Sequence, residues 1–414
     1  MKKSISIFIL SLFTIVVRAD DGMWLPFLLD QSQMHDMQAA GCRMTAEDIY
    51  SVNHTSMKDA VLLFGGGCTG EMISGEGLLL TNHHCGFGYV QEHSDINHDY
   101  VKNGFWAMNK KEEYQCAGLS VTFIVSMEDV TEKMLRGIGN ITDDAKKNLV
   151  IDSMSHAISI QAIAGTKYGA SVRPIYYGNQ FILIVSQTFN DVRLVGAPPE
   201  NVGNFGGDDE NWMWPRHTGD FSLFRIYADK NNEPAVYSAD NIPYQPKYFF
   251  PISIKGINEG DFAMVYGFPG RTTEYISSYA VDFTQKITDP DRVKIRTIKL
   301  NLWMDAMQQS DTVNLHYATK YSGIANGWKK WQGEMDGLQR FKVVDMKKKS
   351  EDSLIQIIHF DKSLSVYSNV LSELKTAYDT LDEYQHIADY YNEALKGSEV
   401  ISFAEKWLDV IDES

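Results

Sequence analysis

Residues 291–414 contain no proline, and this absence limits what that part of the chain can form. Asp289-Pro290 is a helix-start signal directly before it. Apolar residues then recur at helical spacing, at Ile295, Ile298 and Leu302 and again at Leu371, Leu374, Ala377 and Leu381. We therefore expect residues 284–414 to form an α-helical domain of several long antiparallel segments, with a truncated form of that domain as an alternative.

The preceding residues, 20–283, have the pattern of a β-rich domain. Short apolar or alternating runs recur between turn residues, at 61–64, 77–81, 119–125, 181–185, 221–227 and 262–266. Helical interludes are expected near 126–135 and 143–161. With 414 residues, 44% of them hydrophobic, the chain is long enough for two or three packed domains. The sequence thus predicts a mixed β and α fold.

The first 19 residues have the pattern of an export signal. Met1-Lys2-Lys3 is positively charged, residues 5–17 are nearly all apolar, and Ala19 ends a small-residue cleavage pattern. A retained anchor is the alternative. We expect an exported protein with no membrane span in the mature chain, located in the periplasm of a Gram-negative bacterium. The net charge of −16, without a basic cluster, argues against nucleic acid as a partner.

The stretch CTGEMISGEGLLLTNHHC, residues 68–85, predicts a β-hairpin. Residues 69–73 and 78–81 are its strands, and the Ser-Gly-Glu-Gly between them is the turn. The hairpin brings Cys68 close to Cys85, so we expect a disulfide between them that clamps the loop carrying the histidines. The pairing of Cys42 and Cys116 stays open.

His83 and His84 allow three interpretations. A metal site would use them with Cys85 and with His93 or His98. However, adjacent residues of an extended chain point to opposite sides, and the disulfide also requires Cys85. Simple hydrogen bonding within a loop is the second interpretation. The third is catalysis by one histidine, which needs a carboxylate and a nucleophile.

The segment FGGGCTGEMISGEGLLLTNHHCGFGYVQ, residues 64–91, resembles the histidine segment of the dipeptidyl-peptidase 7/11 family. Members of this family are exported bacterial serine dipeptidyl aminopeptidases. The resemblance implies one chymotrypsin-like β-barrel followed by an α-helical cap domain. In chymotrypsin-like enzymes the base precedes a disulfide-bonded cysteine, which selects His84 as the base and gives His83 a supporting role.

The segment NVGNFGGDDENWMWPRHTGDFSLFRIYAD, residues 201–229, resembles the acid segment of the same family. The resemblance makes Asp220 the orienting acid, with capping of the preceding turn as the alternative. It also makes Asn211 and Trp212 substrate-binding residues. Asn326, in NGWKKWQG, resembles a third, although an ordinary helix-breaking Asn-Gly is the alternative there. The implied substrates are oligopeptides with a free N-terminus, no cofactor is needed, and a homodimer is expected.

No serine of this chain lies in a Gly-Asp-Ser-Gly, Gly-Asn-Ser-Gly or Gly-x-Ser-x-Gly motif. The resemblance covers only the N-terminal part of a family member, whose nucleophile lies in a second β-barrel after the helices. We therefore expect that second barrel to be absent, leaving an apolar face uncovered. An inactive peptide-binding fragment and an exported metal-dependent hydrolase remain alternatives.

Overall fold

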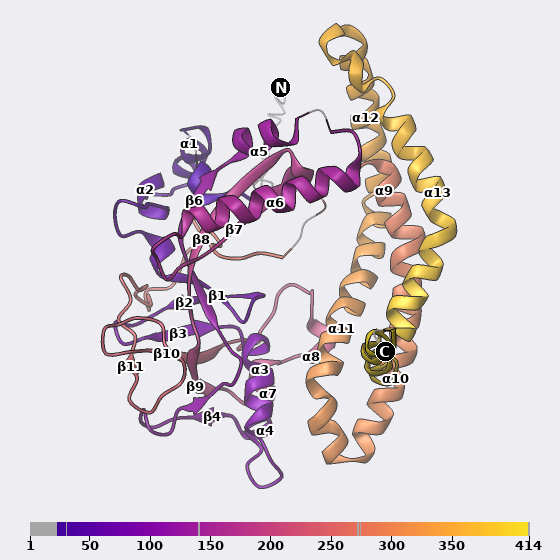
Figure 1. The fold of residues 1–414 in the computed structure, drawn as a ribbon. Coiled ribbons are helices and arrows are strands. Elements are labelled where there is room, and N and C mark those ends of the chain that lie inside the picture. Colours follow the sequence, from indigo (N-terminus) through magenta and orange to yellow (C-terminus); the bar gives the residue numbers. More distant parts are fainter. Residues whose placement is uncertain (1–22, 30, 140, 271–272, 274, 413–414) are drawn as a thin grey trace, which may run out of the picture.

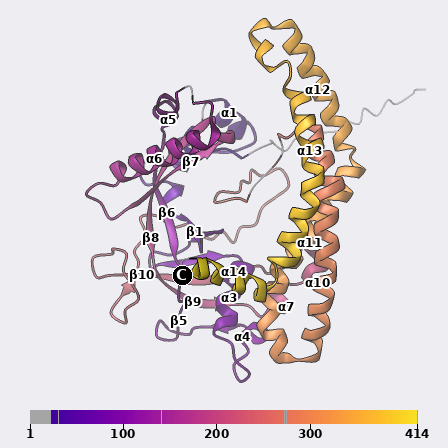
Figure 2. The same cartoon turned by 45° about the vertical axis from the view of Figure 1, so that its right-hand side comes forward.

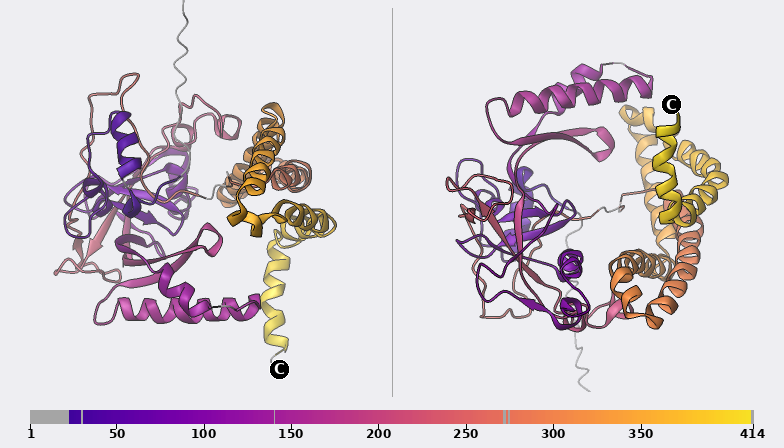
Figure 3. Two further views of the ribbon diagram at one scale, coloured as in Figure 1. Left: turned by 90° about the horizontal axis from the view of Figure 1, so that it is seen from above. Right: turned by 60° about the horizontal axis from the view of Figure 1, so that its bottom comes forward.

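The computed structural model describes residues 23–29, 31–139, 141–270, 273 and 275–412. The predicted export signal, residues 1–19, lies outside these ranges. A β-rich part and a column of long helices stand side by side (Figure 1). The views from other directions show the same arrangement (Figures 2 and 3). The chain is thus a mixed α/β protein with a large antiparallel sheet.

The sheet has eleven strands in the order β4-β9-β10-β3-β2-β1-β6-β8-β7, with β5 paired to β9 and β11 paired to β10. The longer strands are β1 (Val61–Phe64), β2 (Cys68–Met72), β3 (Leu78–Thr81), β6 (Val121–Asp129), β7 (Gly169–Ile175), β8 (Gln180–Phe189), β9 (Asp191–Ala197) and β10 (Ser222–Ala228). The short ones are β4 (Phe105–Trp106), β5 (Tyr114–Gln115) and β11 (Ile242–Pro243). Both strands of the predicted hairpin, β2 and β3, are present.

Seven of these strands form a closed ring. Only Asn190 separates β8 from β9. Phe189 at the end of β8 pairs with Val121 of β6, and Asp191 at the start of β9 pairs with Tyr227 of β10. The path β10-β3-β2-β1-β6 therefore begins and ends on one continuous stretch of chain.

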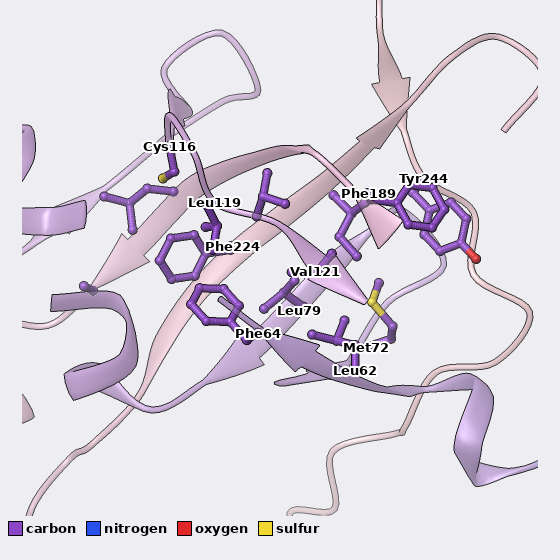
Figure 4. Close-up of a cluster of buried hydrophobic side chains, with 14 of the residues drawn as sticks. Leu62, Phe64, Met72, Leu79, Cys116, Leu119, Val121, Phe189, Phe224 and Tyr244 are labelled. Carbon is purple, nitrogen blue, oxygen red and sulfur yellow. The ribbon is translucent and has the colours of Figure 1, made fainter. Parts of the chain in front are cut away.

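The ring surrounds a core of large apolar side chains (Figure 4). Leu62, Phe64, Met72, Leu79 and Phe224 are at most 2% exposed. The Phe64 and Phe224 rings lie 4.9 Å apart. Burial of each such side chain contributes roughly 1.5–3 kcal/mol, so this core holds β3 and β10 firmly together.

Helices α5 (Thr131–Ile138) and α6 (Asp144–Ala162) pack on β7 and β8. The prediction of a helix over 143–161 is confirmed by α6. The prediction of a helix over 126–135 is wrong for its first half. Strand β6 continues to Asp129, which pairs with Ile182, and the carboxylate of Asp129 accepts a hydrogen bond from the backbone N–H of Thr131 where α5 begins.

The run 262–266 is not a strand in the structure. Phe262, Met264 and Tyr266 alternate and pack on a small cluster that includes Met37 and Ile49. Within the described ranges, however, the backbone of this run pairs with no strand of the sheet. The prediction of a strand at 262–266 is therefore wrong, because alternating apolar residues form a sheet strand only where the backbone pairs with a neighbouring strand.

The helical part begins at Ser278, where the hydroxyl of Ser277 accepts a hydrogen bond from the N–H of Ala280. It comprises α9 (Ser278–Phe283), a π-helical turn (Thr284–Thr288), α10 (Asp289–Gln309), α11 (Asp311–Arg340), α12 (Val343–Phe360), α13 (Val370–Tyr390), a second π-helical turn (Tyr391–Leu395) and α14 (Glu399–Asp412). Arg292 and Arg296 of α10 form salt bridges with Asp389 and Glu393.

The shorter helices are α1 (Gln31–Ala39), α2 (Ala46–Ile49), α3 (His83–Glu92), α4 (Tyr100–Asn103), α7 (Glu200–Gly203) and α8 (Gly207–Glu210). Four 3-10 segments are Pro26–Leu28, Met57–Asp59, Tyr176–Gly178 and Lys362–Tyr367. Across all the helices of the described ranges, none combines the length and the apolar character that a membrane crossing requires. Helix α11 joins the two parts, since its Leu315 and Ala318 pack against the core of the ring.

Candidate active site

The two histidines lie in the first turn of a helix and not in a loop as expected. Helix α3 begins at His83, immediately after β3, with Asn82 as its N-cap. His83 is only 2% exposed, and its ring lies 5.5 Å from that of Phe87. Burial lowers the pKa of His83, an effect that the nearby Asp220 charge only partly opposes. His83 is therefore a neutral, packed residue.

His84 points outward and meets Asp220. Its Nδ1 lies 3.1 Å from Asp220 Oδ2, and its backbone N–H donates to Asp220 Oδ1 at 3.2 Å. The meeting follows from the sheet, because Ser222 at the start of β10 pairs with Thr81 at the end of β3. The His84 side chain is 65% exposed and that of Asp220 is 24% exposed. The imidazole is thus open to reactants while the carboxylate is sheltered.

The carboxylate of Asp220 is held in its charged form. Burial on its own would raise the pKa of Asp220, but hydrogen bonds from the ring and backbone of His84, its charge and the backbone of His83 outweigh burial and lower that pKa. A charged carboxylate next to Nδ1 favours the tautomer with a proton on Nδ1. Nε2 of His84 is then free to accept a proton.

A disulfide links Cys68 of β2 to Cys85 of α3. It joins the start of the hairpin to the turn of helix that carries His84. Cys42 and Cys116 are free and buried, so they are not paired with each other.

Cys68, His84 and Cys85 form the one group of three potential metal ligands that lie close together among the described residues. The disulfide leaves neither sulfur as a thiolate, the form that binds metal ions. The other two histidines of the metal interpretation are engaged elsewhere. His93 stacks on Tyr114 at 4.6 Å, and His98 contacts Asp95 at 3.4 Å.

A cavity of about 1010 Å³ opens beside His84. Asn82, the disulfide and Glu71 line it on the hairpin side, and Trp24 and residues 261–269 line it on the other. Burial raises the pKa of Glu71 to about 7. This cavity gives space for other groups to approach His84.

Asn211, Trp212 and Asn326 also come together, although they lie on different parts of the chain. The amide of Asn211 donates to Asn326 Oδ1 at 2.9 Å, and the indole N–H of Trp212 donates to Asn326 O and Oδ1 at 3.0 Å each. The backbone N–H of Trp212 donates to Asn211 Oδ1 at 3.0 Å. Trp212 has φ of 60°, a backbone conformation that bulky residues rarely adopt and that is concentrated at functional sites. We call these three residues the amide–indole cluster.

Two residues of the site did not emerge from the sequence. Asn82 contacts Asp220 directly, and Glu71 lines the cavity. Both lie within residues 68–85, so the predicted hairpin already places them near the histidines. Their side-chain directions depend on how β3 and α3 pack against β10, which local sequence does not encode.

The sequence matches a known peptidase family and several of its members. The model of the Peptidase S46 family matches residues 19–414. The chain is 47% identical over 372 residues to an Asp/Glu-specific dipeptidyl-peptidase of Capnocytophaga gingivalis, a match that covers 90% of this chain and 52% of that protein. It is 44% identical over 406 residues to one of Flavobacterium psychrophilum, covering 98% of this chain and 57% of that protein.

The structure is also similar to solved ones. The crystal structure of Porphyromonas endodontalis DPP11 in complex with the dipeptide Arg-Asp matches with a TM-score of 0.85 at 35% identity, over 91% of this chain and 54% of that one. The chain therefore spans about half the length of the relatives it matches. The chain has a His–Asp pair beside a disulfide, and its fold is similar to that of DPP11. Because the family model matches nearly the whole sequence, the chain belongs to the peptidase S46 family.

Proposed function

We propose that this chain supplies the general base, the orienting acid and the N-terminus-binding residues of a serine dipeptidyl aminopeptidase. The contact between His84 Nδ1 and Asp220 Oδ2, at 3.1 Å, is the observation that carries the proposal. It is the arrangement that a histidine needs in order to act as a base at Nε2. The dipeptidyl-peptidase names of the relatives support the same function.

In the proposed mechanism, His84 takes the proton of a serine hydroxyl and later donates it to the leaving amine. Asp220 holds the imidazole tautomer and stabilises the imidazolium that forms. The serine comes from a second β-barrel, as the resemblance implies, and reaches His84 from the cavity beside it. The closed ring of β1, β2, β3, β6, β8–β9 and β10 supports the proposal that the present β-rich part is the first barrel of a chymotrypsin-like pair.

The amide–indole cluster is proposed to bind the free N-terminus of the substrate. Each carbonyl oxygen can accept two hydrogen bonds. Asn326 Oδ1 already accepts from Asn211 and Trp212, whereas Asn211 Oδ1 accepts only the N–H of Trp212 among the described contacts. The ammonium group is therefore expected on Asn211 Oδ1, and Asn326 orients the other two side chains. Binding the N-terminus at a fixed place explains why two residues, and not one, would be released.

The test is a chimera. Residues 20–414 are joined to the part of the Flavobacterium psychrophilum relative that lies outside the match, and release of dipeptides from fluorogenic peptides is measured. A panel with acidic and with apolar second residues is used, because the relatives named above are described as Asp/Glu-specific. We expect activity that falls by about 10⁴-fold in Asp220→Asn and at least as far in His84→Ala. An active His84→Ala chimera contradicts the proposal.

A second candidate function is peptide binding without catalysis by the 414-residue chain itself. The observation that favours it is that all three members of the amide–indole cluster lie within this chain and are already hydrogen-bonded to each other. Calorimetry with a tetrapeptide and its N-acetylated form tests it. Binding of the free form only, lost in Asn211→Ala, is the expected result, and equal binding of both forms refutes it.

Location in an exported compartment is part of the proposal. The support is the charged and apolar pattern of residues 1–19 together with the Cys68–Cys85 disulfide, which is typical of oxidising compartments. Fractionation of cells that express the full sequence, followed by N-terminal sequencing, tests it. A product that retains residues 1–19 in the cytoplasmic fraction is the contrary result.

A further inference from the structure

Asn82 does not do what an asparagine at a helix N-cap usually does. The side-chain oxygen of such a residue normally accepts a hydrogen bond from a backbone N–H of the first turn. Asn82 is the N-cap of α3, yet its side chain makes no capping bond. The backbone N–H of His84 donates to Asp220 Oδ1 instead. Asp220, which precedes β10, therefore takes the place of the capping acceptor.

The amide of Asn82 is turned toward that same carboxylate. Its Nδ2 donates to Asp220 Oδ2 at 3.1 Å and to the backbone oxygen of Asp220 at 3.3 Å. The backbone of Asn82 is itself fixed, because its carbonyl oxygen accepts a hydrogen bond from the hydroxyl of Ser222 at 2.8 Å. Asn82 thus links β3, α3 and β10 through its side-chain NH2 group and its backbone carbonyl oxygen.

Oδ2 of Asp220 receives two donors, Asn82 Nδ2 and His84 Nδ1, both at 3.1 Å. A carboxylate with one donor on Oδ1 and one on Oδ2 can still tilt about its Cβ–Cγ bond. The side-chain amide of Asn82 is a third donor, and because its backbone is fixed by Ser222 it restricts that rotation. The two titratable neighbours of Asp220 in this corner, His83 and His84, both stand on α3, and Asn82 at the end of β3 adds an uncharged donor.

We propose that Asn82 is a positioning residue of the proposed peptidase, which aims Oδ2 of Asp220 at Nδ1 of His84 and so keeps the proton on Nδ1. This inference rests on the proposed function for its catalytic consequence, but the tautomer of His84 is a property of the chain by itself. Asn82 touches no reacting atom and acts through Asp220.

Two variants separate hydrogen-bond donation from packing. Asn82→Ala removes the side chain, and α3 keeps its capping acceptor because Asp220 provides it. Asn82→Asp keeps the shape but cannot donate when ionised, and it adds a negative charge beside Asp220. Asn179→Ala is the matched control, since Asn179 donates to Tyr176 O in a hairpin far along the sheet path from β3 and β10.

The first measurement is ¹⁵N NMR of the histidine rings in the 414-residue chain, with the His84 signal assigned from His84→Gln. We expect the Nδ1–H tautomer to dominate in the wild type and in Asn179→Ala. In Asn82→Ala and Asn82→Asp we expect a mixture of tautomers, with circular dichroism unchanged. An unaltered His84 spectrum in both Asn82 variants overturns the inference.

The second measurement is kcat in the chimera described above. We expect a loss of about tenfold in Asn82→Ala with KM nearly unchanged, the size that one hydrogen bond to a charged group supplies. Wild-type kcat in Asn82→Asp would show that only shape matters and would refute the proposal. If the tautomer shifts in the isolated chain while the wild-type chimera is inactive, the proposed function fails and the role of Asn82 in the pair stands.

Discussion

Asp289 gives the most quantitative prediction of the structure. It is 1% exposed at the start of α10, and its Oδ2 is buried without a hydrogen-bond partner among the described residues. Burial raises its pKa to about 7, helped by the negative charges of Glu334 and Asp389 and opposed by Lys330 and Arg292. The folded chain therefore holds a proton here that the unfolded chain releases at much lower pH.

The sign and size of the effect follow from proton linkage. The folded pKa is raised above the ordinary value of 3.8, so the folded state binds more protons between the two values and loses stability as the pH rises through that window. The loss is about 1.4 kcal/mol per pH unit, and it amounts to about 4 kcal/mol above pH 7. Asp289→Asn keeps the shape and does not titrate, so it removes this loss.

The assay is urea unfolding followed by circular dichroism at 222 nm, at pH 5, 6, 7 and 8. We expect the difference in unfolding free energy between Asp289→Asn and the wild type to grow in favour of the variant by about 1.4 kcal/mol per unit up to pH 7, and then to level off. Asp352→Asn, an exposed position on α12, is the control, with a difference within about 0.5 kcal/mol at every pH. A difference for Asp289→Asn that is the same at all four values refutes the reasoning.

Three further predictions concern the site. Replacing Cys68 and Cys85 together by alanine opens a loop with a sequence separation of 17 and should lower the unfolding free energy by about 3 kcal/mol in urea titrations, whereas an unchanged midpoint would contradict the structure. Gly203→Ala should lower the melting temperature and shift the NMR signals of His83, because a Cβ atom at position 203 would lie 2.3 Å from His83 Cδ2. An unperturbed His83 spectrum would be the opposing result. Glu71→Gln should raise the melting temperature at pH 8 and leave it unchanged near pH 4. The reason is that the raised pKa of Glu71 lowers the stability of the fold only as the pH rises from 4.5 toward about 7. Equal gains at both pH values would argue against a buried, titrating Glu71.

The hairpin was predictable because its information is local. Turn residues, alternating strands and two cysteines at its ends determine β2, β3 and the disulfide within 18 residues of sequence. The meeting of His84 and Asp220 was expected only through a family resemblance, since 136 residues separate them. The pairing of β3 with β10 brings them together, and such pairing has no local signal.

The start of α3 shows why the rest was not predictable. Gly86 and Gly88 are poor helix formers, so the sequence favours a loop after Asn82. The helix forms because it packs closely on β10: a Cβ atom at Gly86 would lie 2.6 Å from Ser222 Oγ. In the helical part, the apolar periodicity predicted the helices but not which of their apolar residues are buried. Ile298 and Leu302, for example, are 58% and 65% exposed.

The amide–indole cluster depends on both parts of the chain. Asn211 and Trp212 come from the β-rich part and Asn326 from α11, so the cluster exists only while both are folded and docked. Unfolding or separation of either part would therefore remove the proposed N-terminus-binding site as a whole. The affinity for a peptide with a free N-terminus would then report whether the two parts are docked, and it would fall when they separate, before either part unfolds.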